Sequence, residues 1–169
     1  MSFTSIKGKY THVFADHYDY DIAIDTVPEM TAASLKILHR VMRLFLQLSE
    51  QYDFCPLVIV EPAEVDVSPN TARPDELDLL ARMEHSSGRA RDPRRLSRLI
   101  EEVSGQVGLP TLSLFDDFKG KPFYYTEKEM PKDDHWNPAG MEEAARLTAV
   151  ELQRTCRNIN RATSIARTQ

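Results

Sequence analysis

Long apolar runs are missing from this sequence of 169 residues, and no stretch approaches the roughly 20 apolar residues that a membrane helix needs. The first residues also lack a basic region followed by an apolar one, so the sequence predicts no secretion leader. A formal net charge of −5 argues against a nucleic-acid backbone, which requires a basic surface. We therefore expect neither a membrane nor a nucleic acid as partner, with the cytosol as the default compartment.

Cysteine is scarce as well. Cys55 and Cys156 form no Cys-x-x-Cys or Cys/His spacing, so we expect no zinc site. The acid-base chemistry of a histidine and a carboxylate requires no cofactor, so none is expected. Cys55 precedes an apolar run and is predicted to pack as a small hydrophobic residue. The histidine and aspartates of residues 16–21 match no known metal-site spacing, so a structural loop is favoured over a metal site there. Nothing in this pattern requires an oxidising compartment.

One segment is rich in positive charge, although the net charge of the whole chain is negative. Five arginines lie between residues 89 and 98, around Pro93. We interpret this segment as a solvated loop and helix start, and a contact with a polyanion as the less favoured alternative.

Apolar periodicity predicts an α/β domain. Apolar residues at steps of three and four predict helices over residues 31–51 and 93–107, and Gly108 is placed to end the second. Short apolar runs at residues 57–61 and 110–115 predict strands buried on both faces, as in a parallel sheet. A short helix is expected at residues 75–84, within a long polar connection. The alternation predicts three layers, with a short parallel sheet between helices.

The segment from Asp133 to Gly140 is the most informative part of the chain. It reads Asp-Asp-His-Trp-Asn-Pro-Ala-Gly and leads into an alanine-rich helix. Asn137 is a strong N-cap residue and Pro138 suits the first helical position, with Glu142 and Glu143 expected in the first turn. A histidine acts as a general base when an acceptor holds its other ring nitrogen. We therefore predict His135 as the base.

Asp133 is the predicted orienting carboxylate for His135, with Asp134 or Asp117 as the next candidates. Trp136 either packs beneath this loop, the favoured alternative, or lines a site for an acyl or sugar group. The weaker interpretation of the whole segment is a surface Asp-Asp-His loop that only caps a helix.

The Asp-x-His-Trp-Asn-Pro-x-Gly block resembles the C-terminal catalytic block of the SGNH (GDSL-type) hydrolases. The resemblance extends over residues 31–157 and implies the second half of a flavodoxin-like SGNH domain. It places residues 57–61 and 110–115 as the fourth and fifth strands of that family's sheet. Residues 1–30 then form an N-terminal loop with a short strand at 10–15, and residues 158–169 a flexible tail.

The first three strands of the family have no counterpart in this sequence. With them the Gly-Asp-Ser nucleophile motif and the oxyanion-hole motifs are missing. Ser86, Ser87 and Ser113 lie in no comparable motif, so no nucleophile is identified. The strand at 57–61 should therefore leave a sheet edge that is covered by residues 10–15, by a second copy or by a partner that supplies the missing half.

Two hypotheses follow. The chain is an incomplete ester hydrolase or acyltransferase that acts on a small-molecule or glycan ester, or it is a non-catalytic α/β module that works by binding.

Overall fold

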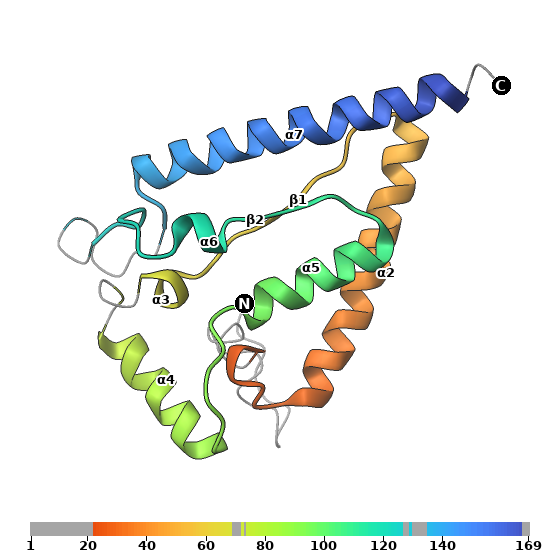
Figure 1. Cartoon of the computed structure of the whole chain (residues 1–169). Coiled ribbons are helices and arrows are strands. Elements are labelled where there is room, and N and C mark those ends of the chain that lie inside the picture. The colour runs from red at the N-terminus through yellow and green to blue at the C-terminus, as the bar shows by residue number, and fades with distance from the viewer. Residues whose placement is uncertain (1–21, 69–71, 73, 127–128, 130–134, 167–169) are drawn as a thin grey trace, which may run out of the picture.

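The computed structural model describes residues 22–68, 72, 74–126, 129 and 135–166. In chain order it contains α2 (Pro28–Tyr52), β1 (Val58–Val60), α3 (Glu64–Val67), α4 (Pro74–Ser87), α5 (Arg95–Val107), β2 (Thr111–Ser113), α6 (Phe115–Phe118) and α7 (Pro138–Ala166), labelled as in Figure 1. The chain is thus mostly helical, with a short parallel sheet. The predicted strand at residues 10–15 lies outside the described residues.

Helix boundaries follow local chemistry. Pro28 occupies the first turn of α2, where its missing N–H costs nothing. The helix ends where Asp53 adopts the left-handed conformation and donates its N–H to the Ser49 carbonyl. Gly108, at φ 85°, ends α5 in the same way, as the sequence predicts, because glycine meets no steric penalty there.

The sheet consists of β1 and β2 in parallel register, with Val58 opposite Thr111, Ile59 opposite Leu112 and Val60 opposite Ser113. The predicted parallel pairing is therefore confirmed, although both strands are shorter than the apolar runs that predict them. Among the described residues, no third strand pairs with β1 or β2.

Helices cover both faces of this sheet (Figure 1). On one face, Val58 packs with α2 and α5 around the buried Met42 and Val103. On the other face, Leu112 and Leu147 of α7 both pack against a buried cluster, most of whose side chains follow β2. That cluster contains Val67, Leu114, Phe115, Phe118, Tyr124 and Ala144. Its side chains surround the carboxyl end of β2, where the chain leaves the sheet.

A disulfide joins Cys55, just before β1, to Cys156 on α7, with the two Cα atoms 5.6 Å apart. The prediction that Cys55 serves only as a small hydrophobic packing residue is therefore wrong, because its sulfur is in a disulfide. The two cysteines are 101 residues apart in sequence, a separation without local signal, and they meet because α7 runs past the loop between α2 and β1. The helix continues to Ala166 and so enters the stretch after residue 157 that the sequence predicts as a tail.

Candidate functional site

The His135 segment is anchored to the loop that follows α6. The Tyr125 N–H donates to the His135 carbonyl over 3.2 Å, and the Asn137 N–H donates to the Phe123 carbonyl over 2.9 Å. Tyr124 and Trp136 thereby face each other in an isolated antiparallel bridge. The His135 carbonyl is thus held by one main-chain hydrogen bond and Asn137, two residues further on, by a second, while the His135 side chain is exposed.

Asn137 connects this segment to α7 and to the neighbouring loop at once. Its Oδ1 accepts from the Gly140 N–H over 3.0 Å, so the predicted N-cap is confirmed. Its Nδ2 donates to the carbonyls of Pro122 (2.8 Å) and Tyr124 (3.0 Å). One side chain therefore satisfies three backbone groups, two of which belong to the loop across from His135.

We expect Asn137→Ala to lower the free energy of unfolding by about 2 kcal/mol, because it removes a helix cap and leaves two carbonyls without their donor. Asn137→Ser keeps a capping oxygen but cannot reach across the loop, so its loss should be about half as large. Chemical denaturation of the two variants measures both effects. Equal losses would mean that the cap alone matters.

Trp136 packs against Phe118, with ring centroids 5.2 Å apart, and is partly buried beside the cluster at the end of β2. Phe118 belongs to α6, which follows β2 directly. The residue next to His135 therefore lies at the carboxyl end of the parallel sheet, the edge at which open α/β sheets bind their ligands. The contact with Phe118 supports the packing alternative for Trp136.

The neighbouring Tyr124 is fixed by a hydrogen bond from its hydroxyl to the Pro62 carbonyl over 2.5 Å. Burial is the main cause that raises the pKa of Tyr124 far above its ordinary value, so this hydroxyl keeps its proton and remains a donor. It links the His135 loop to the segment after β1. No sequence motif predicts a role for Tyr124, although the run from Phe123 to Tyr125 is an aromatic signal in an otherwise polar loop.

Asp133 and Asp134 lie outside the described residues, so the orienting carboxylate is placed by sequence alone. Asp117, the third candidate, is exposed on α6. Glu143 is the main cause that raises the pKa of the Arg146 guanidinium, and Asp117 contributes to the same shift, which places Asp117 towards α7.

Glu142 and Glu143 follow the first turn of α7 instead of lying in it, because the helix begins at Pro138. Their predicted match to the helix dipole is wrong by about one turn.

Six of the described serines have hydroxyls that are donated to another group or buried. Ser49, Ser68, Ser86 and Ser87 donate their hydroxyls to backbone carbonyls. Ser104 donates to the sulfur of Met42, and the Ser113 hydroxyl is buried in β2. None of these six serines thus presents a free hydroxyl for nucleophilic attack.

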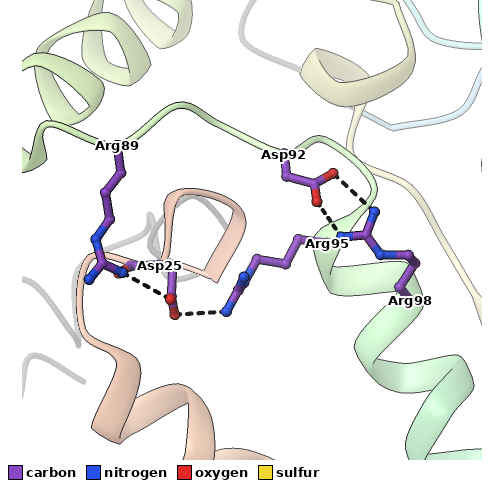
Figure 2. Close-up of polar contacts among 5 residues, drawn as sticks. All are labelled: Asp25, Arg89, Asp92, Arg95 and Arg98. Atoms are coloured by element: carbon purple, nitrogen blue, oxygen red, sulfur yellow. Dashed lines mark hydrogen bonds and ion pairs between the residues drawn. The ribbon is translucent and has the colours of Figure 1, made fainter.

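The arginines between residues 89 and 98 form a network of ion pairs. Figure 2 shows the Asp25 carboxylate between Arg89 and Arg95, each with a nitrogen 2.9 Å from an Asp25 oxygen, and Arg98 paired with Asp92. Arg94 pairs with Asp116, and Arg91 lies 3.7 Å from Asp66. Each cation already has a carboxylate partner, which weakens the interpretation as a polyanion contact. Arg91, Arg94 and Arg95 are only partly exposed, so the segment is less solvated than the sequence predicts.

A cavity of about 440 Å³ lies between α2 and α5 and is lined by His39 and Glu102 among others. It is built by elements other than the His135 loop, so it is not the substrate site expected beside that histidine.

Among the described residues no group of three or more histidine, cysteine or acidic side chains is arranged to hold a metal ion. No helix in the described part of the chain is long and apolar enough to span a membrane.

Comparisons of the chain with protein-family models, with curated proteins and with solved structures find no match.

Proposed function

We propose that the chain carries the general-base part of an SGNH-type ester hydrolase or acyltransferase site, with His135 as the base and Asp133 as its orienting carboxylate. The observation that carries this proposal is the position of the His135 segment. It sits at the start of a long helix, is tied by main-chain hydrogen bonds to residues 123–125, and adjoins the carboxyl end of a parallel sheet. An exposed imidazole on a fixed backbone suits proton transfer to and from a substrate.

The order of elements supports the same proposal. In the described chain, α2 and α5 pack on one face of β1 and β2, and α7 packs on the other. This is the arrangement that the resemblance implies for the last two strands of an SGNH sheet and the helix that follows them. In such chemistry a serine attacks the ester carbonyl, His135 takes the serine proton, and the same imidazolium protonates the leaving alcohol. The acyl group then passes to water or to a sugar hydroxyl.

A non-catalytic binding module is the second candidate, and the hydroxyl partners of the serines favour it. A base without a nucleophile activates at best a water molecule, and the oxyanion donors that are missing from the sequence typically contribute 100- to 1,000-fold each, in order of magnitude.

The purified chain should therefore show no hydrolysis of p-nitrophenyl acetate above background at neutral pH. If turnover occurs, it should vanish in His135→Ala and fall steeply in Asp133→Ala, because an imidazole without its acceptor takes the wrong tautomer. Initial rates of the three proteins, with folding checked by circular dichroism, decide the matter. Turnover that survives His135→Ala would exclude this histidine as the base.

A further inference from the structure

The outer edge of β1 is open in the described part of the chain. The Val58 N–H donates to the Pro110 carbonyl and the Val60 carbonyl accepts from the Leu114 N–H, so Val58 and Val60 direct their backbone groups towards β2. In a parallel ladder the residue between them directs its N–H and C=O the other way. Ile59 therefore presents both groups at the free edge, where no third described strand pairs with it. An edge of this kind accepts a further strand.

Helices α2 and α5 hold equivalent places before the two strands. Each ends a few residues ahead of its strand, α2 before β1 and α5 before β2. The two helices pack against each other and run in the same direction, because Leu35 lines a cavity with Leu99 and the later Met42 contacts Ser104. Helix α5 belongs to the connection that carries the chain from β1 to β2. By the same pattern, α2 belongs to a connection whose first strand precedes residue 28.

Handedness determines where that earlier strand belongs. Connections between parallel strands of one sheet are right-handed in about 98% of cases. Two right-handed connections whose helices cover the same face therefore advance across the sheet in the same direction. The connection through α5 steps from β1 to β2, so the one through α2 steps to β1 from its other side. A strand before α2 thus falls on the free edge of β1, where Ile59 lies.

The first described residues lie at the edge of the sheet from which such a strand would lead into α2. Ile24 packs with Val65 of α3, which follows the carboxyl end of β1. The Ala23 carbonyl accepts from the Asp92 N–H, just before α5. A strand parallel to β1 ends at this same carboxyl edge. The chain is therefore where a preceding parallel strand would leave it.

Apolar surface is left uncovered at the same place. A cavity of about 340 Å³ lies between the first parts of α2 and α5, and Ile22 contributes to its lining. Leu35 and Leu38 line it as well, and both pack against the same buried cluster as Val58 of β1. The cavity thus adjoins the layer between the helices and the sheet, and the first described residue reaches it.

Residues 10–15 are the segment ahead of α2 with the composition of a strand. They read Tyr-Thr-His-Val-Phe-Ala, in which four of the six positions hold β-branched or aromatic residues. Residues 16–21 separate them from Ile22 and can span up to about 20 Å, whereas neighbouring strands are only about 4.8 Å apart. The connection is long enough for residues 10–15 to reach the edge of β1.

We propose that residues 10–15 dock on the free edge of β1 as a third parallel strand and pair with the N–H and C=O of Ile59. The inference is independent of the proposed function, because it concerns the sheet and not His135. The occupant belongs to the same chain, so the short connection raises its effective concentration and a large interface is not required. Residues 16–21 would then begin at the carboxyl edge, the edge at which the His135 segment lies.

The test measures amide exchange and nuclear Overhauser contacts of the Ile59 N–H in the full chain at low protein concentration. We expect this amide to exchange at least about 100-fold more slowly than an unprotected amide, and to show contacts to residues 10–15. Val13→Asp and Phe14→Asp place a charge on either face of the proposed strand and should each speed exchange at Ile59 by about tenfold or more. Ser5→Asp adds the same charge outside the segment and should leave the exchange unchanged.

Three results would overturn the docking proposal. The first is an Ile59 amide that exchanges like an unprotected one in the folded chain. The second is protection that appears only at high protein concentration, which would assign the edge to a second copy. The third is a protected Ile59 whose contacts lead to a segment other than residues 10–15. The contacts are measured on the unmodified chain, so they decide the proposal even if an aspartate variant unfolds.

Discussion

Gly140→Ala should lower the free energy of unfolding by about 2 to 4 kcal/mol, a large loss for a single methyl group. A Cβ at Gly140 would lie closer than 3.0 Å to the Phe123 carbonyl oxygen and 3.0 Å from the Phe123 Cβ. That carbonyl accepts the Asn137 N–H, so the clash falls on the contact that holds the His135 loop against α7. Chemical denaturation followed by circular dichroism measures the loss.

The matched control is Gly105→Ala. Gly105 lies within α5, is exposed, and has no atom within 4 Å of the position that a Cβ would take. Alanine is favoured over glycine in a helix by about 1 kcal/mol, so this variant should be slightly more stable than the original chain. If both variants gained stability, the close approach of Phe123 to α7 would be contradicted.

Reduction of the Cys55–Cys156 disulfide should lower the free energy of unfolding by roughly 4 kcal/mol. The bond closes a loop of 101 residues, and removing it restores freedom to the unfolded chain. Denaturation with and without a reducing agent measures the effect, and a mass increase of about 2 Da on reduction verifies that the bond was present.

A Cys55→Ser, Cys156→Ser double variant serves as the control, since a reducing agent should not alter its stability. An unmodified chain that behaves like this variant under oxidising conditions would show that the disulfide does not form. Bonds of this kind persist in oxidising compartments, so the disulfide favours such a location over the cytosol that the sequence analysis takes as the default.

Elements with a local signal were predictable from the sequence. The apolar periodicity of α2, the glycine after α5 and the Asn-Pro start of α7 each depend on a few neighbouring residues, and the structure confirms all three. The parallel pairing of β1 and β2 followed from the helix between them, because a crossover connection leaves little alternative.

Features that depend on distant residues were not predictable. The Cys55–Cys156 bond and the hydrogen bond from Tyr124 to Pro62 join positions 101 and 62 residues apart in sequence. The steric need for glycine at position 140 arises from a carbonyl in another loop. No sequence pattern around Gly140 indicates that need. The pairing of Asp133 with His135 remains a prediction, since Asp133 lies outside the described residues.

The disulfide also determines what happens when a peptide bond of the chain is cut. Its two ends enclose β1, β2, the His135 segment and the first part of α7 in one ring. If a single peptide bond within that ring were cut, the two fragments would stay joined through the Cys55–Cys156 disulfide. The chain outside the ring would be unchanged. Loops inside the ring can therefore be nicked without releasing the histidine-bearing helix from the rest of the protein.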